Sequence, residues 1–431
     1  MKFSSTRAKS PPASLSDVIA AGLAPDGGLY VPESLPQMSA HDFNGCELLP
    51  DIAARLLAPF FADDALDTEL PAICAEAFSF PAALRALRTP GDFMLELFHG
   101  PTAAFKDYGA QFLAACLRRI PRTSNNPLTI LVATSGDTGA AVAAAFHDVP
   151  GFRVVILYPD GRVSPRQAHQ LGCFGGNVQA FYVGGNFDDC QRLVKQALGD
   201  RALRDDVPMS SANSISLGRL LPQMAYYAQA TLSHYREQST LLNFVVPTGN
   251  LGNALACMMA RKMGLPIGRI VLATNANATL RDFFSGADYA PRPSIATLAN
   301  AMDVGAPSNF ERLRWLYPDA NQLRRTFAVD CIGDAAIQAT IREFHQASDQ
   351  AVCPHTATAI RTLRGLRQEG ADGDWVAVAT AHPAKFDSIV EALIDAPVPI
   401  PPALASLLAL PSTARPLGVD YAALRLLLAE S

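Results

Sequence analysis

The sequence predicts an α/β protein with parallel-rich sheets, and three observations support this fold class. From about residue 93, short apolar runs rich in β-branched residues alternate with patterns of helical length. Such continuous apolar runs are typical of strands that are covered on both faces, as in parallel sheets. Two of the runs lead directly into glycine-containing polar turns, and folds of this class bind ligands at that edge of the sheet. We therefore expect two α/β domains behind a mostly helical N-terminal unit.

The first part of the chain, residues 1–90, predicts the helical unit. Two Ala/Leu-rich stretches in it have helical spacing, at 51–61 and 68–78. A shorter apolar patch, 18–24, is bracketed by Asp17 and Asp26 and falls well below the ~18 residues that a membrane span requires. We interpret this patch as one face of a helix and not as a signal peptide.

The α/β part divides into a smaller segment, residues 91–240, and a larger one, residues 241–431. The runs that predict strands lie at 128–133, 153–158, 177–183, 244–246, 269–274 and 375–380. Patterns of helical spacing between them, such as 187–198, complete βα repeats. The proline-rich stretch 397–402 closes the main body before a leucine-rich helix at 420–429, to which we assign a packing role.

Composition excludes several classes of partner and site. The chain of 431 residues is about three times the ~150-residue prior for one domain, so it can bury sizeable cores. Its 35 Lys and Arg against 40 Asp and Glu give a net charge of −5 without a long basic run, which argues against nucleic acid and membrane surfaces. Eight scattered cysteines, with no CxxC pair and no His-Cys cluster, indicate neither disulfides nor a metal site. We expect a cytoplasmic protein with a small-molecule partner, as a monomer or homodimer.

The stretch 98–107 places one lysine at the start of a predicted helix. Gly100-Pro101 marks a turn, and Thr102 is a candidate N-cap for a helix that runs to about Ile120. Lys106 then lies in the first turn, where the positive end of the helix dipole disfavours a cation and lowers the pKa of the amine. A lysine so placed is a candidate nucleophile. On the local pattern alone, an exposed helix lysine is the commoner interpretation.

The polar turn after the predicted strand 128–133 is a first candidate anion site. It leads into an alanine-rich helix, 140–146, and contains Ser135 and Thr138. Free amides at a helix N-terminus, together with two hydroxyls, suit a carboxylate or a phosphate. An ordinary N-capped βα turn explains the same pattern and stays open as the alternative.

A second turn of this construction follows the strand at 244–246 and consists of Gly249, Asn250, Leu251, Gly252 and Asn253. It lacks the G-x-G-x-x-G spacing of a dinucleotide site, and no acidic residue follows about 20 positions later. It also lacks the Gly-Lys-Ser/Thr of a Walker loop. The turn therefore predicts a cup for one phosphate monoester.

Two further polar groups complete this set. Asn213, Ser214 and Arg219 lie within two turns of each other and can hold a second anion by charge-assisted hydrogen bonds, although a capped surface helix explains them equally well. Thr380 ends the last predicted strand and is expected to aim a hydroxyl at the same crevice, whereas we interpret the histidines at 99, 355 and 382 as structural. A nucleophilic lysine, a phosphate cup, a second anion site and a hydroxyl at a strand end together suit pyridoxal phosphate (PLP).

Six long motifs resemble those of the threonine synthase family. They are HGPTAAFKDYGAQF (99–112), ATSGDTGAAVA (133–143), NSISLGRLLPQ (213–223), VPTGNLGNALA (246–256), TLANAMDVGAPSNFERL (297–313) and TAHPAKF (380–386). SSTR (4–7) and DGGLYVPESLP (26–36) resemble that family's N-terminal segment, so the similarity spans nearly the whole chain. It implies the fold-type II architecture of PLP enzymes and a lyase that converts O-phospho-L-homoserine and water to L-threonine and phosphate, the last step of threonine biosynthesis.

The same resemblance implies a role for each candidate residue. Lys106 would be the Schiff-base lysine, Gly249 to Asn253 would hold the cofactor phosphate, and Thr380 would face the pyridine nitrogen. Ser135 and Thr138 would bind the amino-acid end of the substrate, and Asn213, Ser214 and Arg219 would bind its phosphate.

Three positions, Ser216, Leu217 and Ala306, depart from the family's pattern and are expected to loosen the substrate pocket. Two other functions stay open. A related phospho-lyase would use the same residues and release 2-oxobutyrate, and a non-catalytic binding protein would keep the scaffold without the reaction.

Overall fold

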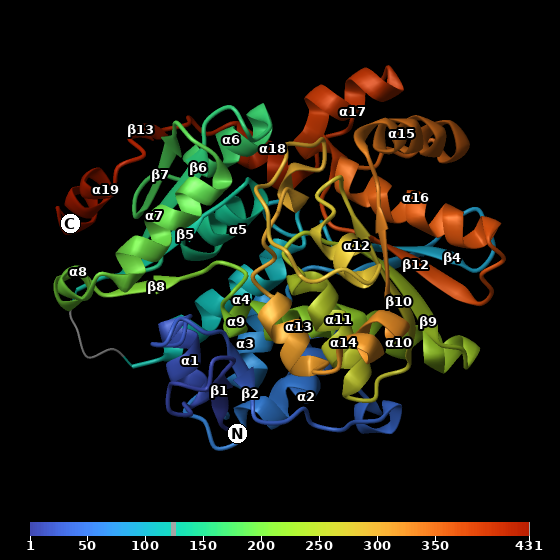
Figure 1. Ribbon diagram of the computed structural model, residues 1–431, viewed down its shortest axis with the longest axis horizontal. Coiled ribbons are helices and arrows are strands. Elements are labelled where there is room, and N and C mark those ends of the chain that lie inside the picture. The colour runs from blue at the N-terminus through green and yellow to red at the C-terminus, as the bar shows by residue number, and fades with distance from the viewer. Residues whose placement is uncertain (122–125, 431) are drawn as a thin grey trace.

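The computed structural model describes residues 1–121 and 126–430, and two sheets form its core (Figure 1). The larger sheet contains β3 (Ala83–Ala86), β4 (Asp92–Glu96), β9 (Leu242–Pro247), β10 (Ile267–Thr274), β11 (Ala328–Cys331) and β12 (Asp374–Ala379). Its strand order is β11-β10-β9-β12-β4-β3, and each pairing is parallel except that of β3 with β4.

The smaller sheet is parallel throughout. It contains β5 (Leu128–Ala133), β6 (Phe152–Pro159), β7 (Val178–Val183), β8 (Met209–Ser211) and β13 (Arg415–Leu417), in the order β13-β7-β6-β5-β8. The strands predicted from apolar runs correspond to β5, β6, β7, β9, β10 and β12, with ends displaced by two residues at most. The predicted α/β class with parallel-rich sheets is confirmed.

Helices cover both faces of each sheet, which explains the continuous apolar runs of the strands. On the larger sheet, α15 (Asp334–Ser348) and α16 (Pro354–Gln368) pack on the face that carries Val245 and Ala377. The opposite face, with Phe244 and Val376, packs on α10 (Met224–Gln238) and α11 (Gly252–Lys262). On the smaller sheet, α7 (Phe187–Gly199) and α5 (Asp137–Phe146) lie on opposite faces.

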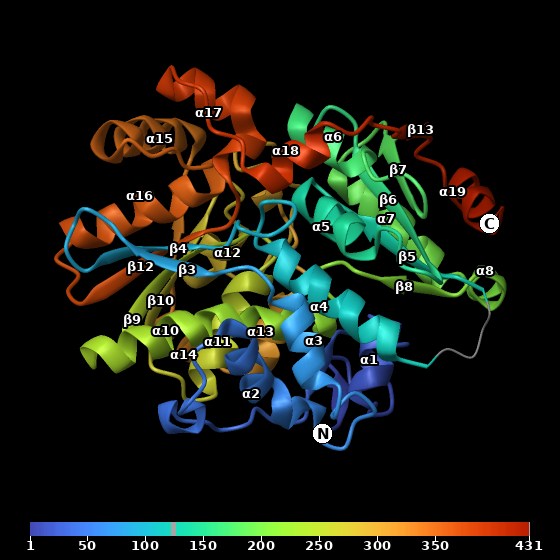
Figure 2. The same ribbon diagram turned by 180° about the vertical axis from the view of Figure 1, so that it is seen from behind.

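The N-terminal unit packs beneath both sheets. It comprises β1 (Phe3–Ser5), α1 (Leu15–Ala21), β2 (Tyr30–Pro32), η1 (Ala40–Phe43), α2 (Leu49–Phe61) and α3 (Leu70–Ala77), and β1 pairs with β2. The helices α2 and α3 confirm the two helical stretches expected in this part. Figure 2 shows α4 (Lys106–Arg119) between this unit and α5, so one helix joins the N-terminal unit to the smaller sheet.

The remaining helices and 3-10 turns connect these layers. They are α6 (Pro165–Gly172), α8 (Arg201–Asp206), α9 (Leu217–Leu220), η2 (Leu221–Gln223), α12 (Thr279–Phe284), η3 (Asn300–Met302), α13 (Phe310–Leu316), α14 (Ala320–Thr326), η4 (Pro383–Phe386), α17 (Asp387–Ile394), α18 (Pro402–Leu408) and α19 (Tyr421–Ala429). Within the two described ranges, we find no helix with both the length and the apolar character to cross a membrane.

The two sheets do not follow the segment boundaries expected from the sequence. Strand β4 lies within 91–240 but pairs with β12 of the larger sheet, and β13 lies within 241–431 but pairs with β7 of the smaller one. Both strands are short, and their own sequences carry no signal for the sheet that they join. The division into domains at residues 91 and 241 stays a prediction.

Candidate active site

Backbone hydrogen bonds fix Lys106 beside the end of β12. The amide of Phe105 donates to the carbonyl of Thr380 at 2.8 Å, and the amide of His382 donates to the carbonyl of Ala103 at 3.0 Å. The turn that precedes α4 is therefore paired with the residues that follow β12. This pairing brings Lys106 and Thr380 together although they are far apart in the sequence.

The predicted N-cap of this helix is wrong. Helix α4 begins at Lys106 and is preceded by Phe105, which makes no side-chain cap. Thr102 instead donates from its backbone amide and its hydroxyl to the two carboxylate oxygens of Asp107, at 2.9 and 2.5 Å. Asp107 is fully buried, and burial raises the pKa of its carboxyl to about 6. Thr102 does not cap the helix because the chain first turns at Ala103, at φ +56°, and α4 begins only at Lys106, with Phe105 in the N-cap position.

The amine of Lys106 lies 4.7 Å from the centre of the Phe105 ring. Burial, and next the positive charge of Arg219, lower the pKa of Lys106 to about 8, whereas the carboxylate of Asp137 acts in the opposite direction. The lowered pKa agrees with the sequence-based expectation. Its largest cause, however, is burial and not the helix dipole on which that expectation was based.

Two adjoining cavities open at Lys106. Lys106, Ser214 and Asn250 line both of them. We call the first the outer cavity, and it is also lined by the remaining predicted residues Ser135, Thr138 and Asn213. The second is the inner cavity, and it is also lined by Arg219, Gly249, Leu251, Gly252, Asn253 and Thr380. Every site residue predicted from the sequence thus lines one or both of the two cavities.

The three departures from the family's pattern lie elsewhere. Ser216 and Leu217 are buried and Ala306 is exposed, and none of them is among the described residues that line either cavity. Any effect of these positions on the pocket would therefore pass through neighbouring residues, and the expectation that they loosen it stays a prediction.

The loop between β9 and α11 has the geometry of an anion seat. Leu251 adopts φ +64°, which turns the chain so that α11 begins at Gly252. The side-chain oxygen of Asn253 accepts hydrogen bonds from the hydroxyls of Tyr226 and Tyr227, at 2.5 and 2.8 Å. Its amide nitrogen is buried and has no partner within the described ranges. An unpaired donor at the N-terminus of a buried helix fits a negatively charged ligand.

Comparisons with known proteins agree with this geometry. Residues 87–381 match the family model of pyridoxal-phosphate dependent enzymes, residues 2–78 match the threonine synthase N terminus, and residues 356–426 match the threonine synthase C-terminal model. The threonine synthase of Serratia marcescens is 38% identical over 428 residues, which cover 99% of this chain and 98% of that protein. This chain belongs to the threonine synthase family.

Solved structures of the threonine synthase family share the whole fold. The enzyme from Escherichia coli superposes with a TM-score of 0.92 at 37% identity, and the match covers 100% of both chains. The PLP-bound threonine synthase from Brucella melitensis superposes with a TM-score of 0.90 at 32% identity, over 100% of this chain and 99% of that one. The predicted family, the fold-type II architecture, the class of PLP-dependent lyase and the cofactor are confirmed.

The residues that surround the inner cavity fit the cofactor of the threonine synthase family. The Lys106 amine, the free donor of Asn253 and the amides that start α11 face one cavity together with Thr380, which is 6% exposed. A Cβ at Gly249 would lie 2.7 Å from the Cα of Met302, so only glycine allows the loop to pass this close to η3. These features suit a phosphorylated aldehyde.

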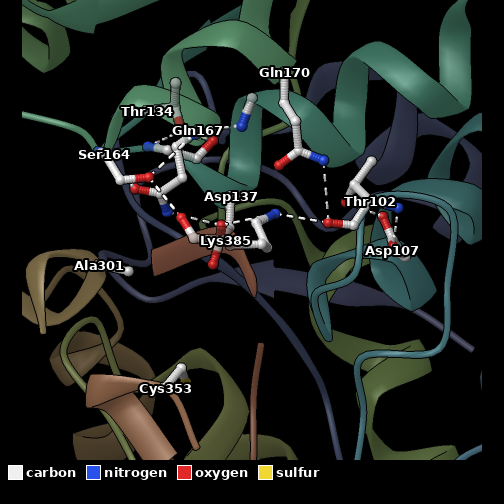
Figure 3. Close-up of polar contacts among 12 residues, drawn as sticks. Thr102, Asp107, Thr134, Asp137, Ser164, Gln167, Gln170, Ala301, Cys353 and Lys385 are labelled. Atoms are coloured by element: carbon white, nitrogen blue, oxygen red, sulfur yellow. Dashed lines mark hydrogen bonds and ion pairs between the residues drawn. The ribbon is translucent and has the colours of Figure 1, made fainter. Parts of the chain in front are cut away.

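A buried polar network around Asp137 and Lys385 was not predicted from the sequence (Figure 3). The ammonium of Lys385 contacts the carboxylate of Asp137 at 3.0 Å and donates to the carbonyl of Thr102 at 2.7 Å. Gln167 donates to the same carboxylate at 2.9 Å. Burial alone would raise the pKa of Asp137, but the charge of Lys385 and the hydrogen bond from Gln167 help to hold it below its ordinary value. Asp137 lies in the motif SGDTG and Lys385 in the motif AHPAKF, and neither motif shows locally that the two charges meet.

His355 also lines the inner cavity, which the sequence-based interpretation did not foresee. Its Nε2 accepts a hydrogen bond from the amide of Ala301 at 3.1 Å, and burial lowers the pKa of the imidazole to about 4. A neutral ring that accepts at Nε2 holds η3 against the cavity. His382 makes a comparable contact with the amide of Ala384, at 3.2 Å.

Proposed function

We propose that this member of the threonine synthase family converts O-phospho-L-homoserine and water to L-threonine and phosphate. One observation carries the proposal: Lys106 lines two adjoining cavities whose walls also carry two groups of candidate anion-binding residues. A reaction between a phosphorylated cofactor and a phosphorylated amino acid needs two such groups, one for each phosphate. The free thiols of all eight cysteines support a reducing compartment, so we also propose a cytoplasmic location, with a monomer or homodimer as the expected state.

Each group of residues has a part in binding. Gly249 to Asn253 are proposed to hold the cofactor phosphate, with Lys106 at its aldehyde and the Thr380 hydroxyl at its pyridine nitrogen. A hydroxyl at that position, instead of a carboxylate, leaves the nitrogen largely unprotonated. When bound, PLP acts as an electron sink that stabilises negative charge on the substrate carbon next to the amino group.

The substrate is proposed to span both cavities. Ser135 and Thr138 would hold its amino-acid end, and Asn213, Ser214 and Arg219 its phosphate. Arg219 is 2% exposed, and its Nε has no hydrogen-bond partner in the described part of the chain. Charge-assisted hydrogen bonds to a phosphate would satisfy this buried donor.

Lys106 is proposed to move the protons. Because its pKa is lowered to about 8, a useful fraction of the amine is neutral near neutral pH and can accept a proton. It would take one proton from Cα and one from Cβ, and loss of the Cβ proton breaks the bond from Cγ to the phosphate oxygen. It would then return one proton to Cγ and, after the addition of water at Cβ, the other to Cα. The phosphate retained near Arg219 is the proposed base for that water.

A product assay tests the proposal. The purified protein is incubated with phosphohomoserine, with and without added PLP, and threonine, phosphate and 2-oxobutyrate are measured. We expect threonine and phosphate in equal amounts. Release of 2-oxobutyrate without threonine would identify the phospho-lyase, and a protein that neither turns over the substrate nor binds PLP would be the non-catalytic alternative.

A further inference from the structure

Helix α13 connects the N-terminal unit to the two anion-binding loops (Figure 1). Its Arg312 is 1% exposed and donates to the carbonyl of Tyr30 in β2 at 3.0 Å and to the carbonyl of Ile215 at 2.7 Å. A third donor reaches the side-chain oxygen of Asn309 at 2.9 Å. Among the described side chains, no carboxylate forms an ion pair with this guanidinium.

Asn309 extends this contact to both loops. Its amide nitrogen donates to the carbonyl of Ser214 at 3.3 Å and to the carbonyl of Asn250 at 3.0 Å. The side chain of Asn250 in turn donates to the hydroxyl of Ser214 at 2.6 Å. One side chain outside both cavities therefore bridges the loop proposed for the substrate phosphate and the loop proposed for the cofactor phosphate.

The outer side of α13 is attached to the N-terminal unit as well. Glu311 accepts hydrogen bonds from the hydroxyl of Thr6 at 2.8 Å and from the guanidinium of Arg7 at 3.3 Å. The N-terminal unit thus holds α13 from both sides, and α13 holds the loops.

Stability alone does not require a cation at position 312. A buried charge without an opposite charge is costly, and an apolar side chain of similar volume often serves as well or better in such a place. Burial accordingly lowers the pKa of Arg312 to about 9. What the guanidinium adds over an apolar side chain is a set of directed bonds that hold the Ile215 carbonyl and Asn309 in fixed positions.

We propose that Arg312 and Asn309 are positioning residues that fix the two anion-binding loops relative to each other and couple them to the N-terminal unit. The assignment of the loops to cofactor and substrate rests on the proposed function. Arg312 acts directly on the loop of Ile215, whereas Asn309 acts on both loops. Loss of Arg312 should therefore weaken phosphate binding more than cofactor binding, and loss of Asn309 should weaken both.

The test compares Arg312→Met, Arg312→Lys and Asn309→Ala with the matched control Arg314→Met. Arg314 lies on the same helix, but its guanidinium donates to the carbonyl of Tyr317 at 3.3 Å, away from both loops. Calorimetry of the PLP-loaded protein measures the Kd of inorganic phosphate, and fluorescence of the apoprotein measures the Kd of PLP. Urea unfolding and the KM and kcat for phosphohomoserine complete the set.

For Arg312→Met we expect the Kd of phosphate and the KM to rise roughly tenfold, as the loss of about 1.4 kcal/mol of oriented hydrogen bonding implies. The Kd of PLP should change less, Arg312→Lys should recover part of the loss, and Arg314→Met should match the wild type. Asn309→Ala should raise both dissociation constants.

If Arg312 only stabilises the fold, the variants should give a different pattern of dissociation constants. If Arg312→Met lowers the urea midpoint but leaves the Kd of phosphate equal to that of Arg314→Met, the proposal is overturned. Should Arg312→Met not fold, Asn309→Ala decides: unchanged dissociation constants for phosphate and PLP would reject it. Failure of the proposed function appears separately, as a wild-type protein that binds both ligands and makes no threonine.

Discussion

Among individual side chains, the amine of Lys106 lies between charged groups that act on it in opposite directions. Arg219 and Lys385 favour its neutral form, and Asp137 favours its charged form. Burial is the largest cause, and together with these two cations it lowers the pKa of Lys106 from 10.5 to about 8. Between these two pH values the unfolded chain binds more protons at this residue than the folded chain, so the contribution of Lys106 to stability rises with pH through that interval.

The reactivity of this amine is the first quantity to measure. In the apoprotein, acylation of Lys106 by a small amine-directed reagent, followed by mass spectrometry, should rise with a midpoint near pH 8 because only the neutral amine reacts. Arg219→Met should move the midpoint upward, since it removes the second largest cause of the shift. A midpoint near the ordinary lysine value in the wild type would contradict the burial that we describe.

All twelve candidate site residues line one or both cavities, because each lies in a polar turn or in the first turn of the helix that follows it, and their roles stay predictions. The sequence did not identify Asp137 and Lys385 as residues of the site. The bond from Lys385 to Thr102 spans 283 positions in the chain, and such a contact depends on how the two sheets meet. Local sequence patterns carry no information on how the two sheets pack against each other.

The pair of Lys385 and Asp137 should be costly to break. Lys385→Met leaves a buried carboxylate without its partner, and we expect the free energy of unfolding to fall by about 3–5 kcal/mol. Urea unfolding of the apoprotein measures this loss. Adding Asp137→Asn should restore much of the stability because neither charge then remains, and a double variant no better than Lys385→Met would show that the charges are not coupled.

Among turns and helices, the loop of Gly249 to Asn253 shows what a glycine pattern predicts and what it leaves out. The pattern indicated a phosphate cup, and the structure adds that Gly249 is pressed against the backbone of η3. The N-cap at Thr102 failed for the same kind of reason, since Ala103 and Phe105 pair with residues that follow β12 and the helix begins only at Lys106. The residue preferences of a turn are local in the sequence. The contacts that select one turn conformation over another come from residues far apart in the chain.

The two glycines of this loop form a matched pair for mutation. A Cβ at Gly249 would meet the Cα of Met302 at 2.7 Å, whereas a Cβ at Gly252 would meet no atom nearer than the Asn309 amide at 3.7 Å. Gly249→Ala should therefore destabilise the protein by about 1–3 kcal/mol and weaken PLP binding. Gly252→Ala should leave the unfolding free energy within about 0.5 kcal/mol of the wild type. Equal effects of the two changes on urea unfolding would show that η3 yields to the added methyl group.

For the molecule as a whole, both ends of the chain support the site from a distance. The N-terminal unit reaches the two loops proposed to bind anions through α13, and the C-terminal segment returns to the smaller sheet, where β13 pairs with β7. The packing role expected for the C-terminal helix is consistent with this arrangement, because Leu424 and Leu428 of α19 are buried against α7. Which sheet this segment joins was not predictable, since a three-residue strand fits either edge.

Helix α7 links this packing to the site, because Phe187, Gln191 and Val194 on it line the outer cavity. Leu424→Ala and Leu428→Ala should each cost about 2–5 kcal/mol and loosen α7, so the KM for phosphohomoserine should rise while the Kd of PLP stays unchanged. Leu426→Ala is the control, because Leu426 lies on the same helix and is 62% exposed. Steady-state kinetics and PLP fluorescence measure the two effects. If the Kd of PLP rises as much as the KM, α19 supports the protein generally and not the outer cavity through α7.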